Sequence, residues 1–241
     1  PESRKAHGQR PGFDHSACGD ARFLVGHPKQ VGQRGLKRPD EHELTVLRRR
    51  GKLIRGYTLA HLPELLGELE RNCQRNGIQV HWAETAAEGN ALISDILRQH
   101  GADLVIKGKS MVSEEMGLNH YLEAQGIRAV ETDLGEFILQ LGGERPSHII
   151  APAIHKDRAE IAQLFATHFP EFPYTDDIEG LTAIARHIMR NYFGRAIAGL
   201  SGVNFAIAET GTLCLVENEG NGRLCTTAPQ VHIAVCGIEK V

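Results

Sequence analysis

Residues 101–113 read GADLVIKGKSMVS, which places a glycine, a strand of the buried type and the beginning of a helix in direct succession. The run Asp103–Lys107 is apolar at its centre and flanked by glycines, which is typical of a strand covered on both faces. Upstream of it, Thr85 is a predicted cap for a helix over 86–100 that ends at Gly101. A helix, a buried strand and a second helix in this order favour an α/β fold.

The same alternation continues along the middle of the chain. Short apolar runs predict strands, and runs with helical spacing predict helices between them. The predicted strands are 78–82, 103–107, 128–132 and 148–151, and the predicted helices are 86–100, 113–124 opened by Ser113, 134–141 and 156–168. Since short loops join these elements, we expect right-handed crossovers and a largely parallel sheet.

The last third of the sequence has a different pattern. A helix over 178–193 is followed by two strand-like runs, 203–208 and 212–217, which the residues Glu209-Thr210-Gly211 separate as in a hairpin. Residues 218–222 read NEGNG, a dense turn signal, and 231–236 form a further strand. The predicted fold is therefore α/β, with a mixed, mostly parallel sheet flanked by helices. Because the chain stops soon after that strand, we expect the carboxyl-terminal part of the domain to be missing.

The amino-terminal residues 1–42 predict an irregular or disordered lead-in, and the domain is expected to occupy 43–241. Residues 1–55 hold 13 Lys and Arg against 6 Asp and Glu, whereas 56–241 carry a net charge of −10. Two helical runs follow the lead-in, and the first is rich in arginine. Since few aromatic side chains are present to stack on bases, a solvated tail and helix are favoured over a nucleic-acid surface.

Composition excludes several classes of protein. With 41% hydrophobic and 24% charged residues, the 241-residue chain resembles an ordinary soluble globular protein. No apolar run approaches the roughly 20 residues that a bilayer requires, and no signal sequence is recognisable. The five cysteines contain no C-x-x-C pair, which favours a reducing, cytoplasmic compartment and no structural zinc. The 13 histidines show no ligand spacing either, so we expect no metal site.

A first candidate site follows the strand at 103–107. The tripeptide Gly108-Lys109-Ser110 lacks the upstream glycine of a P-loop, so that motif is rejected. Lys107, Lys109 and Ser110 nevertheless fall at the carboxyl end of a buried strand, where open α/β sheets bind anions. The alternative is that the lysines are surface residues and the serines only cap a helix.

A second set of candidates lies in the last third of the chain. Asn204 offers a donor and an acceptor, and Glu209 is a possible nucleophile or general base. Arg223, in the glycine-rich segment, could grip a carboxylate or phosphate with two hydrogen bonds. With Thr210 and Asn221, these residues would join the lysines around a small anionic ligand. The alternative is a hairpin turn with an exposed acid and a loop with a solvated arginine.

Three long strings carry a resemblance to a known family. They are KGKSMVSEEMGLNHYLEAQGI, ETDLGEFILQLGGERPSHIIAPAIHKDR and SGVNFAIAETGTLCLVENEGNGRLCTTAPQVHIAVCGIEK. From about Glu43 onward the chain resembles the lactate-utilisation protein B family, whose defining part is the LUD domain. The resemblance implies a fold like that of the sugar-phosphate isomerases and CoA transferases, and a cytoplasmic three-protein system that oxidises L-lactate to pyruvate.

The resemblance also implies 4Fe-4S clusters in the full-length family protein. This chain has no C-x-x-C-x-x-C run, so we expect this fragment to bind no cofactor itself. The leading hypothesis is the LUD-domain portion of an iron–sulfur oxidoreductase subunit for L-lactate oxidation, with other subunits of that complex as partners. One alternative is a non-catalytic docking subunit of the same complex. Another is an enzyme like the CoA transferases or isomerases, in which Glu209 takes the catalytic role by analogy.

Overall fold

The computed structural model describes residues 40–147 and 151–241, and the chain divides into two compact units, 1–56 and 57–241. The predicted lead-in lies almost wholly outside the described residues, as does most of the strand predicted at 148–151. Helix α2 (Glu41–Ala60) begins at a reciprocal cap: the backbone N–H of Glu43 donates to the Asp40 carboxylate and that of Asp40 to the Glu43 carboxylate. None of the residues of α2 is buried.

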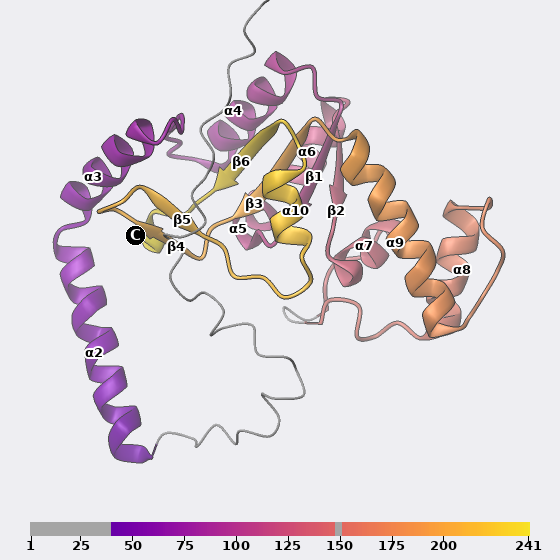
Figure 1. Ribbon diagram of the computed structural model, residues 1–241, viewed down its shortest axis with the longest axis horizontal. Helices are drawn as coiled ribbons and strands as arrows, with labels where there is room; N and C mark the ends of the chain where they lie inside the picture. The colour runs from indigo at the N-terminus through magenta and orange to yellow at the C-terminus, as the bar shows by residue number, and fades with distance from the viewer. Residues whose placement is uncertain (1–39, 148–150) are drawn as a thin grey trace, which may run out of the picture. The chain divides into compact units, whose positions relative to one another are not determined.

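Four parallel strands form the central sheet of the second unit (Figure 1). They are β1 (Leu104–Gly108), β2 (Arg128–Glu131), β3 (Ala198–Gly202) and β6 (Val231–Val235), in the order β2-β1-β3-β6. Strands β4 (Phe205–Ile207) and β5 (Thr212–Cys214) pair antiparallel in a separate hairpin. The predicted α/β class and its mostly parallel sheet are thus confirmed, and the antiparallel pairing belongs to the hairpin.

Helices precede, connect and follow the strands along the chain. They are α3 (Leu62–Arg75), α4 (Ala86–Gln99), α5 (Met111–Glu115), α6 (Leu118–Ala124), α7 (Leu134–Gly142), α8 (Arg158–His168), α9 (Ile178–Arg195), α10 (Asn221–Thr227) and a final 3-10 turn, η3 (Ile238–Lys240). The Thr85 cap is confirmed, since its hydroxyl accepts from the Glu88 backbone N–H. In the part of the chain that the structure describes, none of these helices is long and apolar enough to cross a bilayer.

The two faces of the sheet carry separate apolar clusters. Side chains alternate along β1, so Leu104 and Ile106 join the cluster that contains residues of α7, α8 and α9. Val105 joins the other cluster, with residues of α4 and α6. Helices thus cover both faces of the sheet, and burying each such side chain contributes about 1.5–3 kcal/mol to the stability of the fold.

The structure corrects three local predictions. Residues 78–82 form no strand, although the backbone there is not helical either. Ser110, not Ser113, caps the helix after β1, because its hydroxyl accepts from the Ser113 backbone N–H. The predicted helix over 113–124 is two helices, since Gly117 takes a left-handed conformation with φ of 64° between them.

Neither strand β3 nor helix α10 was predicted from the sequence. The sequence of β3, AGLSG, is poor in β-branched residues, yet all five residues are buried at the centre of the sheet. A side chain at Gly199 would collide with the backbone carbonyl of Cys225 in α10, and one at Gly202 with that of Lys109. The small residues of β3 thus allow two other backbone segments to approach the strand closely.

Candidate functional site

Lys107 lies at the carboxyl end of β1 with a side chain that is only 1% exposed. Its Nζ lies 2.7 Å from Oε1 of Glu131, its register partner on β2, and also pairs with the Glu114 carboxylate of α5. Burial by itself would lower the pKa of Lys107, but the two carboxylates outweigh burial and raise that pKa above its ordinary value. Lys107 is therefore a buried cation neutralised by acids from two neighbouring elements, not a surface lysine.

Glu131 is fixed by further contacts on both its side chain and its backbone. The amide of Asn119 in α6 donates to Glu131 Oε1 at 2.8 Å. The side chain of Gln140 in α7 accepts from the Glu131 backbone N–H and donates to the Ala129 carbonyl. It thus provides hydrogen-bond partners for backbone groups at the open edge of β2. Burial raises the pKa of the Glu131 carboxyl, although Lys107 and Asn119 oppose that change.

Glu136 adds a third acid from the first turn of α7. Burial, followed by the nearby charges of Glu131 and Asp133, raises the pKa of Glu136 to about 8. A carboxyl with such a pKa is protonated at neutral pH, so it can donate a hydrogen bond or a proton.

Lys109 follows two residues after Lys107, and its backbone is unusual. It has a φ of 59°, a left-handed conformation that non-glycine residues seldom adopt. Its Nζ lies 2.9 Å from Asp133 Oδ2 and 3.7 Å from Glu219 Oε2 in the loop between β5 and α10. Burial works against ionisation of Asp133, but the hydrogen bond and charge of Lys109 lower the pKa of Asp133 below its usual value.

Asn221, the first residue of α10, joins this edge of the sheet from the last third of the chain. Its side-chain Oδ1 accepts from the Gly222 backbone N–H, whereas its Nδ2 is buried without a hydrogen-bond partner. That Nδ2 lies 3.6 Å from the point where a side chain on Gly108 would begin. The absence of a side chain at Gly108 therefore leaves this amide facing the segment that carries both lysines.

Cys225 and Thr132 lie beneath the same edge. The Cys225 Sγ and the Thr132 hydroxyl are 3.4 Å apart, and Thr132 also donates to the Lys107 carbonyl. Burial raises the pKa of the Cys225 thiol to about 11. The raised pKa keeps the thiol protonated at neutral pH, which is its less nucleophilic form.

We call this group of side chains the strand-edge network. It comprises Lys107, Lys109, Glu114, Asn119, Glu131, Asp133, Glu136, Glu219 and Asn221. Of the residues that the sequence singled out, Lys107, Lys109 and Asn221 are members, and Ser110 lies beside them with its hydroxyl used as a helix cap. Sequence reasoning missed the acids, although Glu131 and Asp133 fall at the end of the strand predicted at 128–132, which is a signal for charged groups at a strand end.

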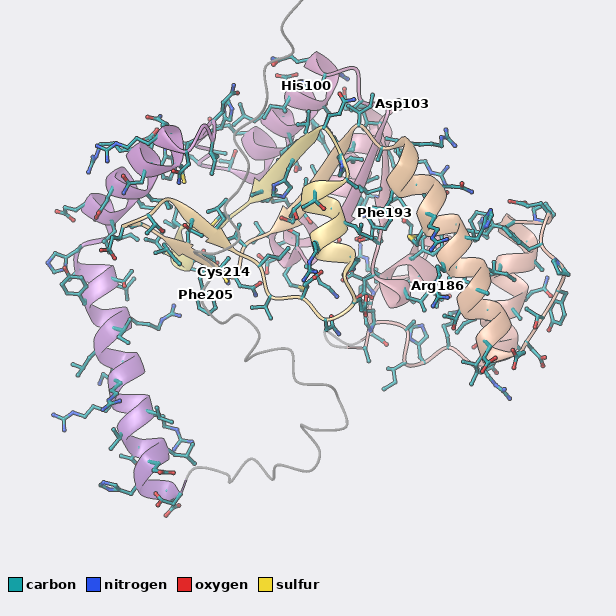
Figure 2. All side chains as sticks on the ribbon, viewed as in Figure 1. His100, Asp103, Arg186, Phe193, Phe205 and Cys214 are labelled. Atoms are coloured by element: carbon teal, nitrogen blue, oxygen red, sulfur yellow. The ribbon has the colours of Figure 1, made fainter. Side chains whose placement is uncertain are left out.

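Two other predicted residues do not contact the network. Arg223 is 77% exposed, and its Nε lies 3.6 Å from the Glu217 carboxylate. Asn204 is exposed, and its side-chain oxygen accepts from the Val216 backbone N–H. Asn204 thus holds the chain beside the β4–β5 hairpin, where Phe205 and Cys214 are cross-strand partners (Figure 2).

Glu209 and Thr210 lie at the hairpin tip, residues 209–211, which packs against α3. Asn72 of α3 donates to the carbonyls of Ala208 and Glu209 at 2.8 and 3.0 Å, and Asn76 donates to that of Thr210 at 2.9 Å. The side chains of Glu209 and Thr210 are exposed, and α3 contacts their backbone. The Thr210 hydroxyl donates to the Thr212 hydroxyl at 2.8 Å. The catalytic role of Glu209 and the ligand-binding role of Thr210 stay predictions.

No group of three His, Cys, Asp or Glu side chains within 40–147 and 151–241 is arranged to hold a metal ion. Of the four cysteines described, Cys73 and Cys225 are buried and Cys236 is exposed. These donors do not fit a 4Fe-4S cluster, so we derive no step through one.

Comparison with known proteins gives consistent matches. The LUD domain matches residues 66–241. The chain is 43% identical over 198 residues to the uncharacterized electron transport protein YkgF of Escherichia coli (strain K12), which covers 80% of this chain and 41% of that protein. It is 43% identical over 189 residues to lactate utilization protein B of Bacillus subtilis (strain 168), covering 78% of this chain and 39% of that protein.

A third relative, lactate utilization protein B of Exiguobacterium sp. (strain ATCC BAA-1283 / AT1b), is 45% identical over 188 residues, covering 78% of this chain and 40% of that protein. The chain thus spans about two fifths of the length of the curated relatives it matches. No solved structure matches it.

Proposed function

We propose a function from one established premise: this chain belongs to the LUD domain family. Its relatives are named for lactate utilization and for electron transport. We propose that it is the LUD-domain portion of a cytoplasmic iron–sulfur oxidoreductase subunit in the oxidation of L-lactate to pyruvate, and that it binds a small anion at the strand-edge network. The other subunits of a lactate-utilisation complex are its proposed partners.

The observation that carries the anion site is the gathering of cations and an unpartnered amide at one edge of a parallel sheet. Lys109 is half-buried, and one of its two acids, Glu219, is 3.7 Å away on a loop. The Asn221 Nδ2 is buried with no acceptor. Each of these groups can donate to a carboxylate, and the carboxyl ends of parallel strands are where open α/β sheets bind ligands.

Lys107 and Lys109 have different parts in this proposal. Lys107 is fully neutralised by Glu131 and Glu114, so it positions the acids around it rather than contacting the ligand. Lys109 keeps some exposure and would contact the anion directly. Ser110 and Arg223 remain proposed ligand contacts. Ser110 would contact the ligand at the start of the helix that it caps, and Arg223 would reach the ligand by a movement of its exposed side chain.

Calorimetry of the 241-residue chain with L-lactate and with pyruvate tests the site. We expect Lys109→Ala to weaken binding by about tenfold or more, since a charged hydrogen bond is worth about 1.5–3 kcal/mol. Lys52→Ala, a change of an exposed lysine in α2, is the matched control and should leave binding unchanged. If neither acid binds, or if Lys109→Ala binds like the wild type, the proposed site is wrong.

A second candidate function, a docking subunit, is favoured by one observation. Helix α2 exposes large apolar side chains, including Leu53 at 64%, Ile54 at 66% and Tyr57 at 62%, next to the basic residues 48–50. Such a surface fits an acidic partner with an apolar patch. Co-purification of sister subunits that is lost on Leu53→Glu, in a chain that binds no lactate or pyruvate, would select this function.

The third hypothesis, an acyl-transferring or isomerising enzyme, depends on Glu209. An acyl-CoA exchange assay on the wild type and on Glu209→Gln tests it. Exchange that the substitution abolishes supports the hypothesis, and unchanged exchange removes the carboxylate from it.

A further inference from the structure

A serine, a histidine and a glutamate contact one another in the segment between α7 and α8. The Ser147 Oγ lies 2.8 Å from Nδ1 of His155. The other ring nitrogen of His155, Nε2, lies 2.9 Å from Oε2 of Glu144. We call these three residues the surface triad. A hydroxyl bonded to an imidazole that a carboxylate holds from its far side is the arrangement that activates a serine as a nucleophile on unrelated folds.

Glu144 is held at the end of α7 by its backbone and by a second cation. Gly143 has a left-handed φ of 65°, and the Glu144 backbone N–H donates to the Leu139 carbonyl at 2.9 Å, which closes the end of the helix. Lys156 contacts Oε1 of Glu144, so Oε2 is left for His155. The hydrogen bonds from Lys156 and His155 lower the pKa of Glu144 below its ordinary value. Glu144 is therefore ionised at neutral pH, and Nε2 of His155 must carry the hydrogen between them.

The position of Ser147 depends on Pro152. The Pro152 carbonyl accepts from the Ser147 backbone N–H at 3.3 Å, and it lies 3.1 Å from the Ser147 hydroxyl. Pro152 is itself buried, and its ring lies 3.2 Å from the point where a side chain on Gly135 of α7 would begin. Since Pro152 packs against α7 and precedes His155 by only three residues, the fold fixes both ends of the bond between Ser147 and His155.

The single hydroxyl hydrogen of Ser147 has two acceptors within reach, and the protonation of His155 decides between them. In neutral His155 the hydrogen is on Nε2, so Nδ1 is free to accept from the Ser147 hydroxyl. In the imidazolium form Nδ1 carries a hydrogen as well and donates to Ser147 Oγ, so the hydroxyl donates to the Pro152 carbonyl instead. The neutral form is thus the one in which a base faces the serine oxygen.

We propose that Ser147 is the nucleophile of an acyl-transfer site for small esters with a good leaving group, with His155 as its general base and Glu144 as the positioning residue. This activity does not rest on the proposed function, because none of the three residues belongs to the strand-edge network. All three are exposed, so a small ester reaches Ser147 from solvent.

The proposed reaction needs no oxidant or reductant. Ser147 Oγ bonds to the acyl carbon while Nδ1 of His155 takes the hydroxyl proton. The bond from the acyl carbon to the leaving alcohol then breaks, and His155 returns the proton to that alcohol. Water attacks the acyl carbon in the second half, with its proton passing through His155 to Ser147 as the acid is released.

Covalent labelling of the 241-residue chain tests the nucleophile. A fluorophosphonate should form an adduct on Ser147, located by mass spectrometry of the digested protein, and p-nitrophenyl acetate should be hydrolysed. Ser147→Ala should abolish both results. Thr167→Ala is the matched control, since Thr167 is an exposed hydroxyl beside a histidine in α8 but donates to the Gln163 carbonyl. It should leave labelling unchanged. The absence of an adduct on Ser147 overturns the proposal.

The roles of the other two residues are tested by the rate of labelling. His155→Ala should slow it by about 100-fold or more, as expected for loss of a general base, and added imidazole should restore part of the rate. His168→Ala, a change of an exposed histidine in α8, is the control and should have no effect. Labelling that is as fast in His155→Ala as in the wild type, or that stays slow with imidazole, overturns the role of His155 as base.

Glu144→Gln separates positioning from a merely structural role. It should lower the maximal rate of labelling and leave the probe concentration at half-maximal rate unchanged, because Glu144 acts through His155 and does not touch the probe. A maximal rate equal to that of the wild type overturns the role of Glu144.

Discussion

The strand-edge network and the hairpin tip both gather polar groups, but they use them differently. In the network, charged side chains from β1, β2, α5, α7 and the β5–α10 loop contact one another, and Lys107 at their centre is 1% exposed. At the hairpin tip, Asn72 and Asn76 of α3 bind backbone carbonyls, while the side chain of Glu209 faces outward.

The comparison shows how a site differs from a packing contact. Burying charged side chains costs free energy, so a buried cluster of charges indicates that the surrounding fold is arranged to hold it. Amides that bind carbonyls satisfy the backbone and fix a loop, which is a structural task. The network therefore carries the proposal, and the hairpin tip does not.

The largest effect should come from removing the cation of the network. Lys107→Met leaves Glu131 buried with no opposing charge, so we expect the free energy of unfolding to fall by about 3–5 kcal/mol at neutral pH. Urea denaturation followed by circular dichroism measures this. The double variant Lys107→Met with Glu131→Leu removes both charges and should recover much of the loss. A single variant as stable as the wild type would contradict the buried ion pair.

A smaller effect should come from Glu136, with a sign set by its pKa. Folded Glu136 keeps its proton up to about pH 8, whereas the unfolded residue loses it near 4.5. The folded state thus binds more protons across that window, and stability falls as the pH rises from 4.5 to 8. Glu136→Gln abolishes this loss.

Relative to the wild type, Glu136→Gln should gain on the order of 2 kcal/mol between the two ends of that window, because each unit of pKa shift is worth about 1.4 kcal/mol and Glu131 takes part of the shift. Urea denaturation at a series of pH values measures the difference. Parallel stability curves for the two proteins would show that Glu136 titrates normally.

The smallest effect is expected at the hairpin tip. Asn72→Ala removes two hydrogen bonds to the carbonyls of Ala208 and Glu209, and a net loss of about 1–2 kcal/mol should follow. Glu209→Gln keeps the backbone that Asn72 binds and should change stability by less than about 0.5 kcal/mol. Thermal denaturation compares them. A larger loss for Glu209→Gln than for Asn72→Ala would mean that the Glu209 side chain, not its carbonyl, holds the tip.

Local pattern was sufficient for most of the α/β alternation. The strand at 103–107, the helix capped by Thr85 and the hairpin around 209–211 were each predicted close to their observed bounds, because each depends on neighbours in the chain. The strand predicted at 78–82 was wrong, since a short apolar run forms a strand only where a partner strand is available.

The sequence by itself determined where the chain turns, which helices are amphipathic and that two lysines end a buried strand, since these follow from spacing and residue type. Only the tertiary structure decided that AGLSG becomes the strand beside β1, because its glycines make room for the backbones of α10 and the turn at Lys109. It alone decided which acids surround the lysines. Glu114, Glu131, Glu136 and Glu219 are up to 105 residues apart in the chain, and their pairing depends on strand register and crossover handedness, which no local pattern encodes.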